Sequence, residues 1–154
     1  MSAAVRAAQP ADVPAIGRIV AAAYSPYIDR IGRAPAPMET NHYDLVSTTD
    51  QVYVLTDEDP DGLIVGVLVL VDEPDHVFVD SVAVATERRG RGHGRTLLAF
   101  AEQRAHERGC GEVRLYTNAA MTENLVFYPR LGYVEVDRRV DNGYDRVYFT
   151  KDVG

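Results

Sequence analysis

The stretch between residues 76 and 109 constrains the fold of this chain more than any other, because the hydrophobic period changes within it. Residues 76–85 are rich in β-branched side chains, which predicts a strand that ends near Ala85. From residue 95 onward, apolar side chains recur at helical spacing, and Gly109 is suited to end that helix. Three glycines, at positions 90, 92 and 94, separate the two elements. The chain therefore combines strands and helices, with a tight bend at their junction.

The rest of the chain alternates between the same two periods. Residues 12–24 place apolar side chains on one helical face, with Pro14 in the first turn. Residues 25–37 contain three prolines and predict a loop with a broken helix, which runs into a second helix at about 39–47. Gly66, inside an apolar run, marks a bulge or a place of close packing. Further strands are expected at residues 5–8, 51–56, 62–71, 112–117, 133–140 and 144–153, and a short helix perturbed by Pro129 at 122–132.

The order of these elements predicts an α+β fold in a single domain over residues 1–154. The three runs within residues 51–85 form an antiparallel meander, and the last two strands form a hairpin around an Asn-Gly turn. One crossover unit joins these antiparallel parts. We therefore expect one central mixed sheet of about seven mostly antiparallel strands, flanked by about four helices.

Charge and composition exclude several classes of protein. The net charge is −7, which argues against nucleic acid as the main partner and weakly favours a cationic substrate. The single cysteine, Cys110, can form neither an internal disulfide nor a cysteine-rich metal cluster. We find no secretory signal, and the longest apolar run, residues 63–71, is only as long as a strand. A cytoplasmic protein with no membrane partner is expected.

The glycine-rich bend has the features of an anion-binding site. Its freed backbone amides and the first turn of the following helix would point outward together, and a helix N-terminus attracts negative charge. The arginines at 88, 89, 91 and 95 add positive charge, so the assembly suits a pyrophosphate. Neither the phosphate loop of NTPases nor the dinucleotide-binding glycine pattern is present. The alternatives are a surface turn with solvated arginines, and an arginine–glycine segment that binds nucleic acid.

Two segments resemble the general (GNAT-type) N-acetyltransferases. The run V-A-V-x-x-x-x-R-G-R-G-H-G-R-x-L-L is similar to that family's loop signature, Q/R-x-x-G-x-G/A, with Arg89, Gly92 and Gly94 at the matching positions. The run E-N-L-V-F-Y-P-R-L-G-Y at residues 123–133 resembles the second landmark, a helix ending in Tyr followed by Gly and an aromatic residue. The order of elements also matches along nearly the whole chain, and residues 22–38 resemble a bacterial subgroup of small members.

This resemblance implies an enzyme in which a primary amine attacks acetyl-CoA directly within a ternary complex. The strand over residues 81–84 is expected to splay from its neighbour, so that its backbone binds the pantetheine arm and polarises the thioester carbonyl. Coenzyme A is the implied co-substrate, with no metal. The cofactor-binding residues implied by the resemblance are Val82, Ala83, Val84, Arg89, Gly90, Arg91, Gly92, His93, Gly94, Arg95, Thr96, Asn118 and Asn124.

The resemblance also suggests the groups that move protons. Tyr128 matches the tyrosine that protonates the departing thiolate, although it could instead be an aromatic ring packed under the cofactor. Asp80 is the best candidate for the base, with a hydrogen bond to a neighbouring strand as the alternative role. His76 and Glu73 are the next candidates. The remaining positions, His42, His106 and Cys110, are interpreted as ordinary surface, helix or unreactive residues.

The acceptor is the least defined part of the sequence. The region between the first two helices usually forms a wall of the acceptor site in this family, which points to Tyr24, Tyr27, Arg30 and Met38, with Tyr43 and Tyr144 as further candidates. These tyrosines could equally pack a loop onto the sheet. The acceptor class remains open between a small molecule and a peptide amine, a homodimer is left open, and the alternative function is a non-catalytic acyl-CoA-binding sensor or interaction module.

Overall fold

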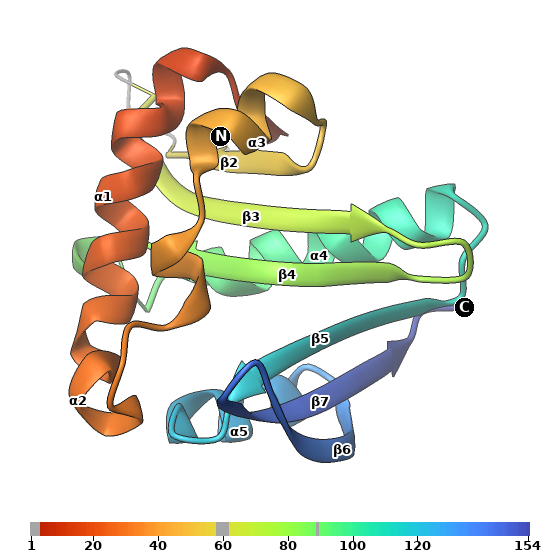
Figure 1. The fold of residues 1–154 in the computed structure, drawn as a ribbon. Helices are drawn as coiled ribbons and strands as arrows, with labels where there is room; N and C mark the ends of the chain where they lie inside the picture. Colours follow the sequence, from red (N-terminus) through yellow and green to blue (C-terminus); the bar gives the residue numbers. More distant parts are fainter. Residues whose placement is uncertain (1–3, 58–61, 89) are drawn as a thin grey trace.

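The computed structural model describes residues 4–57, 62–88 and 90–154. Their strands form one seven-stranded sheet in the order β1-β2-β3-β4-β5-β7-β6 (Figure 1). Every neighbouring pair is antiparallel except β4 and β5, which are parallel. The predicted α+β fold with a mixed, mostly antiparallel sheet is therefore confirmed. The strands are β1 (Ala4–Ala7), β2 (Val52–Thr56), β3 (Ile64–Asp72), β4 (Val77–Val84), β5 (Glu112–Asn118), β6 (Val134–Asp141) and β7 (Tyr144–Asp152).

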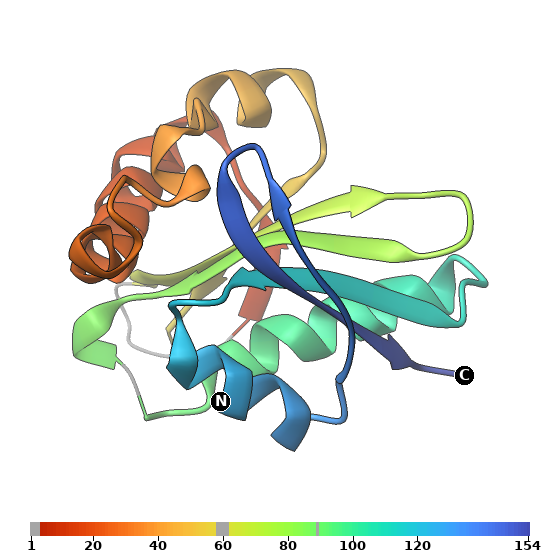
Figure 2. The same ribbon diagram turned by 60° about the horizontal axis from the view of Figure 1, so that its bottom comes forward.

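Helices cover both faces of the sheet. Figure 2 shows α1 (Val13–Tyr24), α2 (Ile28–Ile31) and α3 (His42–Thr48) on one side, and α4 (His93–Glu107) and α5 (Thr122–Arg130) on the other. The apolar stripes predicted from the sequence are the faces that pack. Burial of such stripes against the sheet is the main favourable term in forming this arrangement. The buried helical residues include Ile16, Ile19, Val20 and Ala23 of α1, and Leu97, Leu98, Ala101 and Ala105 of α4.

The boundaries differ most from expectation between α1 and β2. The second helix begins at His42 rather than near residue 39, because Asn41 caps it by accepting a hydrogen bond from the Asp44 amide at 3.1 Å. The preceding residues, Ala36–Glu39, form a separate 3₁₀ turn. The broken helix expected in this region is present as the single turn α2, which ends at Gly32 in a left-handed conformation.

Gly66 satisfies both interpretations of a glycine within a strand. The register between β2 and β3 shifts beside it, at Leu55 and Thr56. A Cβ atom at Gly66 would lie 2.9 Å from Leu97 Cδ1 and 3.3 Å from Leu55 Cβ. The absence of a side chain here therefore allows α4 to pack closely on the sheet.

Strand β4 has an extra residue at its centre and diverges from β5 beyond it. Ser81 pairs with Val69 and Val79 pairs with Leu70, so Asp80 is the bulged residue. The parallel pairing of β4 with β5 ends at Val79. Beyond that residue the two strands separate, as predicted from the resemblance, and Figure 1 shows them spreading apart toward the side of the molecule where α1 lies.

Candidate active site

Two cavities meet at the place where β4 and β5 separate. The first, of about 500 Å³, lies along the far end of β4, the bend before α4 and the start of α5, and we call it the loop cavity. The second, of about 50 Å³, lies between the sheet, residues 35–37 and the start of β7, and we call it the hairpin cavity. The residues that line both are Tyr24, Val82, Met121, Asn124 and Tyr128. The two cavities thus share one boundary, formed by these five residues.

The loop cavity contains most of the residues expected to bind the cofactor. Those in its lining are Val82, Ala83, Val84, Gly90, Gly92, His93, Gly94, Arg95 and Asn124. Arg91 is exposed and lies outside the lining, and Arg89 falls outside the described residues. Thr96 Oγ1 donates to the Gly92 carbonyl at 3.0 Å within the first turn of α4, so its hydroxyl is already engaged. Asn118 lines the hairpin cavity instead, and its Oδ1 accepts a hydrogen bond from the Ala120 amide at 2.9 Å.

The bend before α4 has the backbone geometry that its glycines allow. Gly90 and Gly92 have φ angles of 82° and 79°, in the left-handed region that other residues avoid. Gly92 is also the N-cap of the 15-residue helix α4. The first turn of that helix faces the loop cavity, and the first amides of a helix have no acceptor within it. The cavity therefore ends at donors suited to an anion.

His93 adds a polar atom without a partner at this position. The side chain is 8% exposed, and its Nε2 has no hydrogen-bond partner within the part of the chain that the structure describes. A buried polar atom that is unpaired costs free energy, and a water molecule or a ligand that supplies the missing hydrogen bond is one explanation for it. His93 lines the loop cavity, as expected for a cofactor contact.

Tyr128 lies at the junction of the two cavities. Its ring is buried, with ring centroids 5.7 Å from Phe149 and 6.0 Å from Tyr133, so the packing role is real. Its hydroxyl has no hydrogen-bond partner among the described residues, yet the side chain lines both cavities. Burial, with a smaller contribution from Tyr27, raises the pKa of the Tyr128 phenol well above its ordinary value. The group therefore keeps its proton and is available as a donor.

Tyr24 forms the opposite side of this junction. Its hydroxyl donates to the Val82 carbonyl at 2.8 Å, which joins α1 to the part of β4 that has left β5. Burial raises the pKa of the Tyr24 phenol, and nearby Tyr128 raises it further. Tyr24 was expected in the acceptor wall, and the structure places it at the boundary between the two cavities.

Asp80 lies in the hairpin cavity, two positions before Val82, the β4 residue that lines both cavities. Burial raises the pKa of its carboxyl group, and the charges of Arg146 and His42 oppose that rise. Of the two interpretations of His42, a surface or a helix residue, the helix residue is correct, because His42 begins α3, and the surface residue is wrong, because His42 is 7% exposed. Its Nε2 has no hydrogen-bond partner among the described residues. Burial lowers the pKa of His42, and the charge of Asp80 opposes that effect. The other proposed bases, His76 and Glu73, lie in the β3–β4 turn and line neither cavity.

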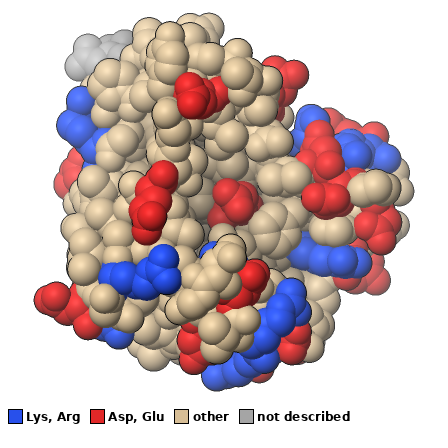
Figure 3. Space-filling view, viewed as in Figure 1, with Lys and Arg blue, Asp and Glu red and all other residues tan. Residues whose placement is uncertain are grey.

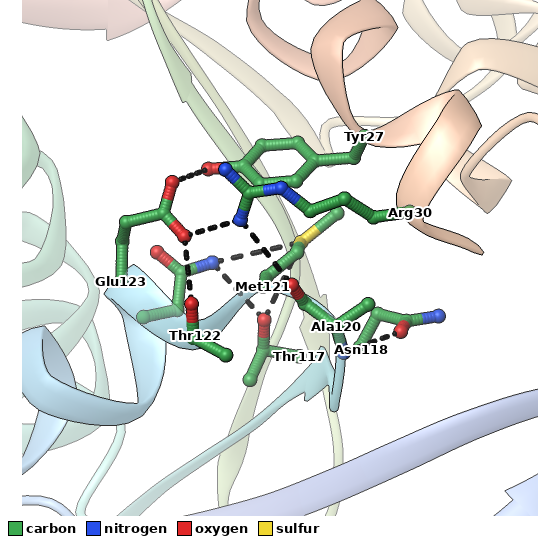
Figure 4. Close-up of polar contacts among 9 residues, drawn as sticks. Tyr27, Arg30, Thr117, Asn118, Ala120, Met121, Thr122 and Glu123 are labelled. Atoms are coloured by element: carbon green, nitrogen blue, oxygen red, sulfur yellow. Dashed lines mark hydrogen bonds and ion pairs between the residues drawn. The ribbon is translucent and has the colours of Figure 1, made fainter.

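Two of the other predicted acceptor residues, Tyr27 and Arg30, form polar contacts with α5. Figure 4 shows Tyr27 and Arg30 pointing at Glu123. The Glu123 carboxylate accepts hydrogen bonds from the Tyr27 hydroxyl at 3.0 Å and from Arg30 Nη1 at 2.7 Å. The Arg30 guanidinium holds the pKa of the Glu123 carboxyl at about 2. Tyr27 and Glu123 both line the loop cavity, from its two opposite sides, whereas Arg30 lines neither. Met38 also lies outside both linings and packs against the core, and Tyr43 is exposed.

Sequence reasoning missed the basic wall of the hairpin cavity. Arg146 is 8% exposed, its guanidinium lies 4.3 Å from the centroid of the Tyr116 ring, and its Nη1 donates to Asp141 at 3.0 Å. Tyr144, also in this lining, donates to the Ala34 carbonyl at 2.6 Å. Tyr144 was among the further acceptor candidates from the sequence, whereas Arg146 was not. The alternation of Tyr, Arg and Tyr at positions 144, 146 and 148 places these side chains on one face of a strand, and this pattern could have identified Arg146.

Comparison with known proteins identifies the family. The model of the Acetyltransferase (GNAT) family matches residues 18–133, three quarters of the chain, so this chain belongs to that family and is an N-acetyltransferase by membership. N-alpha-acetyltransferase 80 of Mus musculus is 39% identical over 64 residues, which are 42% of this chain and 19% of that protein. The chain thus matches less than a fifth of that relative's length.

Solved structures share the fold at low sequence identity. The GCN5-related N-acetyltransferase described as "Aminotransferase, Class-II" from Rhodopseudomonas palustris has a TM-score of 0.77 at 22% identity, with 99% of this chain and 96% of that chain covered. The PaiA N-acetyltransferase of Thermoplasma acidophilum, in complex with coenzyme A, has a TM-score of 0.76 at 17% identity, with 99% of each chain covered. Within residues 4–57, 62–88 and 90–154, no helix is long and apolar enough to cross a membrane.

Proposed function

We propose that this chain transfers the acetyl group of acetyl-CoA to a primary amine by direct attack within a ternary complex. The observation that carries the proposal is the meeting of the two cavities at Tyr128, beside the unpaired part of β4. The loop cavity has a volume of about 500 Å³ and ends at donors suited to an anion, as a cofactor would need, and the hairpin cavity has a carboxylate for an amine. Both reach the same opening in the sheet.

The backbone of β4 would hold the cofactor's arm. From Asp80 to Val84 the edge that faces β5 has no strand partner among the described residues, although the Val82 carbonyl accepts the Tyr24 hydroxyl. The other amides and carbonyls of this edge would be available to an extended amide chain. The first turn of α4, with Gly92 as its cap, would hold the pyrophosphate. His93 Nε2 supplies one more donor or acceptor at that end of the loop cavity.

The proton transfers are assigned to two side chains. The amine nitrogen attacks the thioester carbonyl carbon, a C–N bond forms, and the C–S bond breaks. Asp80 accepts the proton that the amine loses, directly or through a water molecule, and Tyr128 donates its proton to the departing sulfur. A β4 amide that donates a hydrogen bond to the developing oxyanion would lower the activation barrier by about 3 kcal/mol.

The first test is binding of acetyl-CoA to the intact chain. Saturation at 100 times the Kd stabilises the folded state by about 2.7 kcal/mol, which raises the unfolding midpoint by roughly 5–10 °C for a chain of this size. Release of free thiol from acetyl-CoA, in the presence of an amine, then separates an enzyme from a sensor. A midpoint shift without thiol release across a broad panel of amines would favour the non-catalytic alternative, and no midpoint shift would contradict both.

A further inference from the structure

The hairpin cavity contains one acidic and one basic side chain in its lining, Asp80 and Arg146, when the described residues are considered. The rest of the lining is aromatic, apolar or uncharged. Figure 3 shows the corresponding face of the molecule hollowed near its centre, with a single acidic side chain at the bottom of the hollow and uncharged atoms around it. An acceptor in this cavity would therefore meet one charge of each sign.

The two charges lie at different distances from the reaction centre. Asp80 is on β4, next to the opening at Tyr128. Arg146 is on β7, where it pairs with Asn118 of β5, so β5 lies between the two charged residues. The pairing of β4 with β5 ends at Val79, so the two strands no longer lie side by side at the level of Asp80 and Arg146. The carboxylate is thus on the strand that borders the opening, and the guanidinium is on a strand two places away in the sheet.

The Arg146 guanidinium is held in place and keeps N–H donors that no described residue accepts. Its guanidinium is stacked on Tyr116 and fastened to Asp141 by one hydrogen bond, although the group carries five N–H donors. Arg146 makes no other side-chain hydrogen bond to the described residues, and Asp141 also accepts from the Tyr148 hydroxyl at 3.1 Å. A planar guanidinium that is nine-tenths buried and already oriented is well suited to a carboxylate.

From this placement, and resting on the proposed function, we propose that the acceptor is a small primary amine that carries its own carboxylate, with the amine at Asp80 and the carboxylate at Arg146. The small size follows from the cavity, whose volume of about 50 Å³ is closed over by Pro35, Ala36 and Pro37. The ammonium end would be drawn to the acid beside the thioester, and the anionic end would be kept away from it. A neutral amide in place of the carboxylate would leave the spare Arg146 donors with a weaker acceptor.

The test compares amines that differ only in this group. Thiol release is measured with acetyl-CoA and 4-aminobutyrate, and then with 4-aminobutanamide, since the three methylene groups keep the pKa values of the two amines close. Glycine and β-alanine, each against its amide, test shorter spacings. Hydrogen bonds to charged groups predict a kcat/KM about 10- to 100-fold higher for the best carboxylate than for its amide. Equal values, or a preference for the amides, would overturn the inference.

Variants locate the preference. Arg146→Gln should bring the carboxylate-to-amide ratio of kcat/KM close to one, and Arg146→Lys, which keeps the charge without the planar fork, should give an intermediate ratio. The control is Arg139→Gln, because Arg139 stacks on Tyr148 at 3.9 Å but lines neither cavity, and this variant should keep the full ratio. An Arg146→Gln protein that retains the ratio, and still shows the acetyl-CoA midpoint shift, would contradict the assignment.

Failure of this inference and failure of the proposed function give different results. Acetyl-CoA binding with a kcat/KM for neutral amines that equals or exceeds that for the matched carboxylates would leave the proposed function standing and contradict the carboxylate-bearing acceptor. Acetyl-CoA binding without turnover of any carboxylate-bearing amine would also remove it. An amidated peptide beginning with Asp carries the same two groups on a larger molecule, and a preference for that peptide over the free amino acids would overturn the small acceptor.

Discussion

Replacing Tyr128 by Phe removes one oxygen atom from the junction of the two cavities and leaves the ring in place. Because the Tyr128 hydroxyl has no hydrogen-bond partner among the described residues, its loss should change the free energy of unfolding by less than about 0.5 kcal/mol. The matched control is Tyr133→Phe. Tyr133 is a neighbouring buried ring whose hydroxyl donates to Glu102 at 3.1 Å, and loss of that bond should cost about 1 kcal/mol.

Tyr128→Phe should lose more activity than Tyr133→Phe, although it loses less stability. If the Tyr128 hydroxyl protonates the departing thiolate, its removal should lower kcat by about 10²- to 10⁴-fold, a rise of roughly 3–5 kcal/mol in the barrier. The midpoint shift with acetyl-CoA should stay the same, because the ring that lines the loop cavity remains. Tyr133 lines neither cavity, so Tyr133→Phe should turn over like the unchanged chain.

The assay is thiol release under saturating acetyl-CoA and amine, with urea unfolding of the same preparations. A Tyr128→Phe variant within about threefold of the original kcat would refute the assignment, since general acid catalysis contributes far more than that. Equal losses in Tyr128→Phe and Tyr133→Phe would show instead that the aromatic packing, and not the hydroxyl, supports turnover.

Three further predictions test the bend, the carboxylate and the close packing. Gly92→Ala should lower the free energy of unfolding by about 1–2 kcal/mol through left-handed strain, and calorimetric titration should show weaker binding of acetyl-CoA. Gly109→Ala, with φ of 74° at the other end of α4, should lose stability to a similar extent but bind acetyl-CoA as the unchanged chain does. Asp80→Asn should lower kcat but raise the free energy of unfolding at pH 7. Burial holds the pKa of the Asp80 carboxyl group higher in the folded state than in the unfolded state, so the Asp80 carboxyl group destabilises the folded state increasingly as the pH rises. Urea unfolding should therefore show that the stability gained by Asp80→Asn shrinks toward acid pH. Gly66→Ala should cost about 1–3 kcal/mol in thermal unfolding through overpacking, while Gly17→Ala, in an open helical position, should gain up to about 1 kcal/mol.

The sequence was most informative where local rules and packing agree. The apolar stripes of α1 and α4, the three-stranded meander and the left-handed glycines of the bend all follow from period and residue type, and the structure has each of them. The helix start at His42 was placed too early, because the cap at Asn41 depends on one side-chain hydrogen bond that propensity does not reveal.

The site was harder to predict where it depends on distant segments. Glu123 attracts Tyr27 and Arg30 from 96 and 93 positions away, and nothing in the local pattern near residue 30 indicates that partner. His42 is polar and starts a short helix, which usually means exposure, but the fold packs it near Asp80. Such long-range neighbours arise from the topology of the sheet and are not encoded in any single window of sequence.

Part of the hairpin cavity's wall comes from two short stretches, around residues 35–37 and 144–146. They lie about 110 positions apart and are joined by the hydrogen bond from the Tyr144 hydroxyl to the Ala34 carbonyl. Neither stretch takes part in the bend that begins α4. If the hairpin cavity binds the acceptor and the loop cavity binds the acyl donor, as proposed, substitutions in either stretch can change the acceptor preference, one residue at a time, without altering how the acyl donor is held. A lineage with this architecture is able to diversify its substrates by small steps, and laboratory selection for new acceptors should begin with libraries at these two stretches.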